Sequence, residues 1–309
     1  MSPSIPTPLN PKRHLGAAVR RAVGAPMVPQ VPEGRIVELP GRGTTFVVDA
    51  PGPAGAPTLV LLHALATTGY LSWYPVIAEL TRSYRVVVLD QRWHGRGITS
   101  PTFRIEDCAD DVAALLDVLE IERCIPVGYS LGGLVAQAVA HRHPDRVEGL
   151  VLCATARNFR GKRQEQLFFP LLSGAMLPLR PLVHRRVGRS TANLAELPSA
   201  VPTDKGWGLH EFRSTSAWSM PAVLNELGRF NSAAWVGEIA TPTTVIVTTK
   251  DKTIPPHRQR KLADAIPGAH VQELEGGHVS LVLRAKEFEH ALVTALASVA
   301  ARRHTTVAS

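Results

Sequence analysis

The residues that could do chemistry in this chain of 309 residues begin with a serine between two glycines. Residues 128 to 132 read Gly-Tyr-Ser-Leu-Gly, a G-x-S-x-G pattern with Ser130 at its centre. In a nucleophile elbow these glycines let the chain leave a strand and enter a helix within a few residues, which strains the serine and lifts its hydroxyl above the sheet. The pattern alone is common, but here the apolar run CIPV precedes it and the helix-like LGGLVAQAVAHRH follows it. We therefore predict Ser130 to be a nucleophile; an ordinary serine in a glycine-rich loop is the alternative.

A serine hydroxyl needs a base to take its proton, normally a histidine held by a carboxylate. Downstream, Asp251 follows the apolar run TVIVTTK, and His278 follows a short strand-like segment and two glycines. Ser130, Asp251 and His278 all follow predicted strands, so all three are expected at the carboxyl ends of a parallel sheet, where ligands bind in such folds. Asp264 is the alternative carboxylate.

The third requirement is an oxyanion hole of two backbone N–H groups. The N–H of Leu131, directly after the nucleophile at a helix start, is one candidate. The loop after TLVLL, reading His63-Ala64-Leu65, should supply the other from Leu65. Chemistry of this kind needs no cofactor and no metal, and we expect neither. His141 and His143 lie at a helix end, where a cation suits the helix dipole, and we do not predict a metal site there.

Strand-like and helix-like segments alternate through residue 155, which predicts an α/β fold with a mostly parallel, doubly wound sheet. GRIVELP and GTTFVVDAPG predict an opening hairpin. Further strands are expected at 57–64, 84–90, before Ser130, in RVEGLVLCAT, in TPTTVIVTTKD and in AHVQELEG. Helices are expected around 73–80, 105–119, after Ser130, and over 255–265 and 279–300.

The alternation stops from about 156 to 237, a stretch with several prolines and no convincing strand. We predict three parts: a flexible N-terminal segment (1–34), a core (35–155 and 238–301) and an inserted helical lid (156–237). The lid sequence contains many apolar residues that could wall a pocket: Phe159, Phe168, Phe169, Leu171, Leu172, Met176, Leu177, Leu179, Trp207, Phe212 and Trp218.

The net charge of +8 is concentrated in residues 157–190, which carry basic residues at 157, 160, 162, 163, 180, 185, 186 and 189 against the single acid Glu165. The same segment holds the apolar run LFFPLLSGAMLPLRPLV. Mixed basic and apolar residues suit peripheral membrane or lipid contact better than a nucleic-acid groove, so no nucleic-acid partner is expected. A helical lid with a basic solvated face is the other interpretation.

The three cysteines, Cys108, Cys124 and Cys153, are scattered and form no C-x-x-C pair. This argues against a disulfide framework or a zinc site and for a reducing compartment. The first 34 residues are rich in proline and contain no apolar signal core, and no stretch reaches the roughly 18 apolar residues of a membrane span. A cytoplasmic location is therefore expected, and the oligomeric state stays open.

Together these segments resemble the α/β-hydrolase family from about residue 44 to 297. LHALATTG resembles its His-Gly oxyanion loop, LDQRWHGRGIT its D-x-R-G-H-G-x-S segment, and DKTIPP and GGHVSLV its acid and base segments. Ala64 and Trp93 stand where the family usually has glycine. The first is expected to tighten the oxyanion loop and the second to put an indole near the pocket mouth. Other polar residues of these loops are expected to brace them: His63, Asp90, Arg92 and His94.

The resemblance implies a serine hydrolase, because Ser130 stands at the nucleophile position. Family members such as epoxide hydrolases and haloalkane dehalogenases use an aspartate there, so their reactions are not expected. With an apolar lid, a carboxylic ester with a hydrophobic acyl part is expected, as in a carboxylesterase or a monoacylglycerol lipase. A C–C hydrolase or enol-lactonase of aromatic ring cleavage is an alternative, as is haloperoxidase-like perhydrolysis. A non-catalytic small-molecule receptor on the same fold is the alternative of another class.

Overall fold

The computed structural model describes residues 32–159, 211, 215 and 219–307, and within them an eight-stranded sheet forms the core. The strand order is β1-β2-β4-β3-β5-β6-β7-β8. Strand β2 is antiparallel to β1 and β4, and every other neighbouring pair is parallel. This confirms the predicted mostly parallel α/β sheet and its opening hairpin. The strands are β1 (Gly34–Leu39), β2 (Gly43–Ala50), β3 (Thr58–Leu62), β4 (Arg85–Leu89), β5 (Ile125–Tyr129), β6 (Leu150–Cys153), β7 (Thr243–Thr248) and β8 (His270–Leu274).

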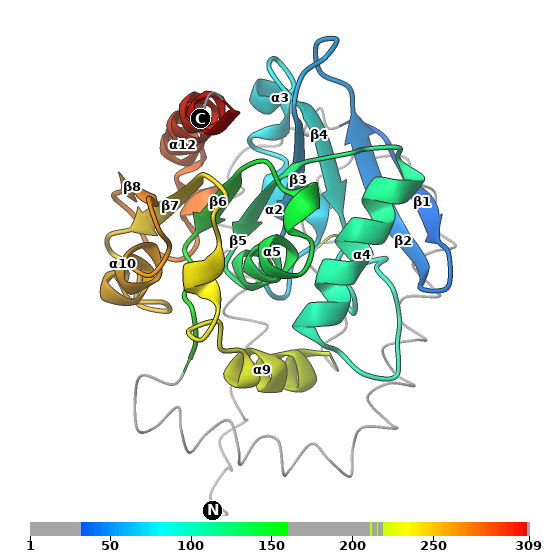
Figure 1. Ribbon diagram of the computed structural model, residues 1–309. Helices are drawn as coiled ribbons and strands as arrows, with labels where there is room; N and C mark the ends of the chain where they lie inside the picture. Colours follow the sequence, from blue (N-terminus) through cyan, green and yellow to red (C-terminus); the bar gives the residue numbers. More distant parts are fainter. Residues whose placement is uncertain (1–31, 160–210, 212–214, 216–218, 308–309) are drawn as a thin grey trace, which may run out of the picture.

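Helices cover both faces of this sheet (Figure 1). In β3, Val60 and Leu62 join the core on one face, while Leu59 and Leu61 join the core on the other. The alternation explains why the strand reads as a continuous apolar run, since successive side chains point to opposite faces and both are buried. The first face packs under α4 (Ile105–Val118), α5 (Leu131–Arg142), α9 (Met220–Arg229) and α10 (Pro256–Ala263), and the second under α2 (Gly69–Trp73), α3 (Ile77–Leu80), α11 (Ser280–Leu283) and α12 (Ala285–Val307).

Two of the predicted helices are each divided in two. The stretch predicted around 73–80 forms α2 and α3 with Pro75 between them, because proline lacks the N–H that would continue the helical ladder. The stretch predicted over 279–300 forms α11 and α12, and Arg284 between them has φ −132° and ψ 48°. Its guanidinium donates a hydrogen bond to the Glu275 carbonyl and pairs with Glu287, contacts that the sequence pattern does not reveal.

Most of the predicted N-terminal segment and of the predicted lid lies outside the described residues, so these two parts and the lipid contact of residues 157–190 stay predictions. The two described ends of the lid range lie against each other. Asn158 and Asn231 form an isolated antiparallel bridge, and the Ser232 N–H donates to the Arg157 carbonyl at 2.9 Å. Among the described helices, none is long and apolar enough to cross a membrane.

Candidate active site

Ser130 alone separates β5, which ends at Tyr129, from α5, which begins at Leu131. Its backbone has φ 54° and ψ −111°, in a region that residues other than glycine rarely occupy. The neighbouring chain holds this conformation from both sides. The Ser130 N–H donates to the Cys153 carbonyl at 2.9 Å, and the Thr155 hydroxyl donates to the Ser130 carbonyl at 2.9 Å. The strain is thus maintained by contacts with the end of β6, as expected for a functional turn.

The flanking glycines are required by close approach rather than by a left-handed backbone. A Cβ on Gly128 would lie 2.2 Å from the Gly132 carbonyl oxygen, and one on Gly132 would lie 2.0 Å from the Leu62 carbonyl oxygen. Both neighbours are backbone atoms and cannot rotate away. Any side chain at these two positions would therefore collide with backbone atoms, and the start of α5 is packed directly on the end of β3.

Gly132→Ala is expected to destabilise the fold by about 3 kcal/mol, because the new methyl group would have to displace the end of β3. Gly237→Ala is the matched control, since a Cβ there would meet only the Ala265 carbonyl oxygen at 3.5 Å, an ordinary contact. Urea denaturation of both variants measures the difference. Equal stability of the two would contradict the packing described above.

The structure brings the three predicted catalytic side chains together. The Ser130 Oγ lies 2.9 Å from His278 Nε2, and His278 Nδ1 lies 2.7 Å from Asp251 Oδ2. The three residues follow β5, β7 and β8, so they meet at the carboxyl edge of the parallel strands. The alternative carboxylate, Asp264, is exposed at the end of α10, away from this chain of hydrogen bonds.

Asp251 is buried and accepts hydrogen bonds on both carboxylate oxygens. Oδ1 accepts from the N–H groups of Thr253 and Ile254 at 2.8 and 2.9 Å, and Oδ2 accepts from the Thr248 hydroxyl at 2.9 Å as well as from His278. Burial opposes ionisation, but the hydrogen bond and the electrostatic interaction with His278, together with the other donors, outweigh it and hold the pKa of Asp251 below its ordinary value. A carboxylate only accepts, so His278 carries its proton on Nδ1 and leaves Nε2 free for the Ser130 hydroxyl.

Two polar residues around Asp251 are absent from the sequence-based predictions. The buried Gln259 of α10 donates to Asp251 Oδ2 at 3.3 Å and to the Ile254 carbonyl at 2.7 Å. Thr248, at the last position of β7, donates to the same carboxylate oxygen. Neither residue type nor spacing marks them, because threonine is common in strands and glutamine is common in helices.

Of the two predicted oxyanion donors, Leu131 belongs to the elbow and Leu65 to a loop that begins beside it. Leu131 is the first residue of α5, so its N–H has no acceptor within the helix. Leu65 lies in the loop that follows β3. The last residue of β3, Leu62, packs on Gly132. The loop places its left-handed residue at Ala66, with φ 65°, and not at Ala64. Alanine at 64 therefore needs no strained backbone, and its predicted tightening of the loop stays a prediction.

The family model for the alpha/beta hydrolase fold matches residues 57–285. This chain belongs to the α/β-hydrolase fold family. It is 31% identical over 252 residues to RutD of Pseudomonas syringae pv. syringae, named as a proposed carbamate hydrolase, covering 77% of this chain and 93% of that protein. The crystal structure of an enol-lactonase from Burkholderia xenovorans LB400 is similar, with a TM-score of 0.66, 28% identity and 85% and 99% of the two chains covered. The structure of Est816, titled an N-acyl homoserine lactone degrading enzyme, is similar with a TM-score of 0.60 and 26% identity. The match covers 84% of this chain and 99% of that chain.

Trp93 replaces the glycine usual in the α/β-hydrolase segment after β4, and the prediction for its indole is wrong. Trp93 adopts φ 62°, the left-handed conformation that explains a glycine at this position. Its side chain is only 4% exposed, packs near Phe103, and donates from Nε1 to the Ser100 carbonyl at 3.1 Å. The indole therefore stabilises the loop from within instead of lining a pocket mouth.

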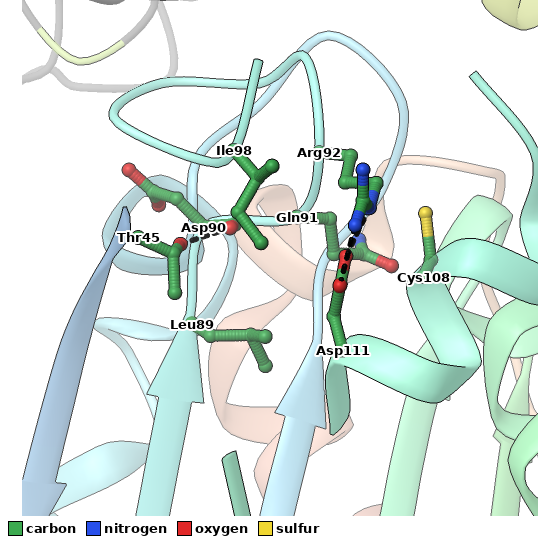
Figure 2. A pocket seen from close by; sticks show the side chains of 8 residues that line it. All are labelled: Thr45, Leu89, Asp90, Gln91, Arg92, Ile98, Cys108 and Asp111. Carbon is green, nitrogen blue, oxygen red and sulfur yellow. Dashed lines mark hydrogen bonds and ion pairs between the residues drawn. The ribbon is translucent and has the colours of Figure 1, made fainter. Parts of the chain in front are cut away.

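The charged residues of this loop brace it, but they do so with different partners. Arg92 pairs with Asp111 of α4, with Nη2 2.8 Å from Oδ1 (Figure 2). Asp90 accepts from the N–H of Gly69 at 2.8 Å and of Arg96 at 2.9 Å, and so joins the loop after β4 to the start of α2. The predicted bracing role of both residues is confirmed.

His63 and His94 are fully buried beneath these loops, with ring centroids 5.1 Å apart. His63 accepts from the Gln91 N–H at 2.9 Å and bonds the Ala64 carbonyl at 2.8 Å, while His94 bonds the Arg92 carbonyl at 2.8 Å. Burial lowers the pKa of His63 to about 4, and burial together with the neighbouring His63 lowers the pKa of His94 to about 3. Both histidines brace these loops, as predicted, and their lowered pKa values keep both neutral at physiological pH.

Stability is expected to fall as pH drops from 6.5 toward 4. In that window the unfolded histidines bind protons while His63 and His94 stay neutral in the fold, so each costs about 1.4 kcal/mol of unfolding free energy per pH unit. Urea denaturation at several pH values measures this slope. His94→Asn should remove about half of the slope contributed by the pair, whatever it does to stability at pH 7; an unchanged slope would contradict the assignment.

Proposed function

We propose that this protein is a serine hydrolase that cleaves a carboxylic ester with a hydrophobic acyl part through an acyl-enzyme. The observation that carries the proposal is the continuous chain of hydrogen bonds from the strained Ser130 through His278 to the buried Asp251. A structural serine would not need a left-handed backbone, a histidine acceptor and a buried carboxylate in series.

In this mechanism the Ser130 hydroxyl gives its proton to His278 Nε2 as its oxygen attacks the substrate carbonyl. Asp251, ionised because its pKa is lowered, stabilises the imidazolium that forms. The N–H groups of Leu131 and Leu65 stabilise the oxyanion of the tetrahedral intermediate. His278 then protonates the leaving group, the acyl-enzyme remains, and His278 activates a water that hydrolyses it.

A lactone is the second candidate substrate, since it is an ester whose acyl and alcohol parts are joined in a ring. It is supported by the likeness to an enol-lactonase and to an N-acyl homoserine lactone degrading enzyme, at 28% and 26% identity. The carbamate in the name of the 31% identical relative also has a carbonyl bonded to a heteroatom leaving group. The hydrophobic acyl preference rests on lid residues that lie almost entirely outside the described ones.

A panel of p-nitrophenyl esters of increasing acyl length, run beside an aliphatic lactone and an enol-lactone, tests both candidates. Ester turnover that rises with acyl length up to a medium or long chain supports the ester proposal and measures the acyl site. Turnover of lactones alone would replace it with the second candidate. If no member reacts and a fluorophosphonate probe does not label the folded protein, the hydrolase proposal fails and a receptor role takes its place.

A further inference from the structure

Glu211 and Thr215, between β6 and β7 in the sequence, lie buried against the loop after β3, with 3% and 5% exposure. The Thr68 hydroxyl donates to Glu211 Oε2 at 2.5 Å, and Arg96 Nη2 lies 3.4 Å from Glu211 Oε1. Thr68 Oγ1 also accepts the Leu71 N–H at 3.1 Å and so caps α2. Because the Thr68 hydroxyl has one proton, donating it to Glu211 leaves its lone pairs directed at the helix start.

Thr215 joins the same loop to the loop after β4. Its hydroxyl donates to the Thr67 carbonyl at 3.3 Å and accepts from the Gly95 N–H at 3.2 Å. The two residues thus contact consecutive positions of the oxyanion loop, Glu211 at Thr68 and Thr215 at Thr67. Both contacts reach the loop from outside the strands and helices that carry the catalytic triad.

Thr67 in turn holds the peptide group that contains the Leu65 N–H. The Thr67 hydroxyl donates to the Ala64 carbonyl at 2.7 Å, and the same carbonyl lies 2.8 Å from His63 Nδ1. The Ala64 carbonyl and the Leu65 N–H belong to one planar trans peptide, so fixing the carbonyl direction points the N–H the opposite way. A loop held at Thr67 and Thr68 therefore fixes the direction of the predicted oxyanion donor.

We propose that Glu211 and Thr215 are positioning residues that hold the Leu65 N–H in the orientation required for the oxyanion hole. The proposal rests on the proposed acyl transfer, because this N–H affects the rate only if an oxyanion forms. It makes activity depend on two residues that touch neither the triad nor the oxyanion. Removing an oxyanion donor outright costs roughly 10²–10³-fold in rate, and a misdirected donor should cost less.

Thr215→Val tests the contact with a side chain of the same shape that has no hydroxyl. We expect kcat on the best ester of the panel to fall about 10–100-fold with KM unchanged within about 2-fold, since the donor acts on the transition state. Thr215→Ser, which restores the hydroxyl, should recover kcat to within about 3-fold of wild type. Glu211→Gln, which weakens the pairing with Arg96, should lower kcat about 10-fold by the same route.

A trifluoromethyl ketone inhibitor gives an independent measure, because its adduct with serine carries an oxyanion in the hole. Its Ki should rise in each variant by the same factor by which kcat/KM falls. Glu148→Gln is the matched control: this carboxylate lies just before β6, at the amino ends of the parallel strands, and pairs with Arg303, so its loss should lower the melting temperature and leave kcat and Ki unchanged.

The outcomes separate the two proposals. Folded Thr215→Val and Glu211→Gln proteins that keep wild-type kcat and Ki, or that change KM alone, would overturn the positioning role while the hydrolase proposal stands. Wild-type protein that turns over no ester or lactone and is not labelled by the fluorophosphonate would overturn the proposed function and this inference with it.

Discussion

Replacing Ser130 by alanine is expected to lower kcat on any ester substrate by about 10⁶-fold, with KM little changed. The loss is large because the acyl-enzyme cannot form without the hydroxyl that lies 2.9 Å from His278 Nε2. Alanine keeps the same Cβ in the same left-handed backbone, so folding stability should change by less than about 1 kcal/mol. Steady-state kinetics measures the loss of kcat, and labelling by a fluorescent fluorophosphonate measures the loss of the reactive hydroxyl.

Ser83→Ala serves as the matched control for labelling, because Ser83 is exposed in a turn before β4 and takes no part in the site. Wild-type and Ser83→Ala proteins should label equally, and Ser130→Ala should not label at all. Persistent labelling or turnover in folded Ser130→Ala protein would show that another residue is the nucleophile.

The second large effect is expected for Asp251→Asn, which should lower kcat by about 10⁴-fold. An amide at this position can donate to His278 Nδ1, which stabilises the tautomer whose Nε2 carries the proton and cannot accept from Ser130. The amide also removes the charge that stabilises the imidazolium. Because the carboxyl pKa is lowered in the fold, the wild-type residue stays ionised at neutral pH, and the deficit should be present throughout the neutral range.

Asp264→Asn is the control that the chain offers, since this exposed carboxylate at the end of α10 is the alternative raised by the sequence. Its kcat should stay within about 2-fold of wild type. A large loss of kcat in Asp264→Asn with little loss in Asp251→Asn would show that Asp264 is the carboxylate that orients His278, and it would contradict the geometry. Circular dichroism and urea denaturation of both variants separate chemistry from misfolding.

Much of the fold could be predicted because the signals that specify it are local. Leu59, Val60, Leu61 and Leu62 are all buried, on alternating faces of the sheet, and this gives a continuous apolar run that predicts a doubly covered strand without knowledge of its neighbours. The elbow could be recognised locally as well, because Gly128 and Gly132 belong to a short pattern between a strand and a helix, but the Leu62 carbonyl that requires a glycine at 132 comes from the distant strand β3. Ser130, Asp251 and His278 could be nominated because each follows such a strand.

Other features depend on side-chain directions that no sequence pattern encodes, even where the residues are close in sequence. Thr248 and Gln259 lie three and eight positions from Asp251, and their contacts with it follow from the path of the chain between β7 and α10. Trp93 is buried because its left-handed backbone turns the indole inward toward Phe103. The helix break at Pro75 can be predicted from the sequence, because proline cannot continue the helical ladder. The break at Arg284 cannot, because it is accompanied by a contact with Glu275 that only the folded structure shows.

The sequence by itself determined the order of strands and helices, the family and the three residues nominated for the chemistry. Only the tertiary structure decided the distances from Ser130 to His278 and from His278 to Asp251, and the contacts of Glu211 and Thr215 with the loop that holds Leu65. The physical reason is that secondary structure follows from side-chain periodicity along the chain. The direction of a hydrogen bond between distant segments is set only when the whole core has packed.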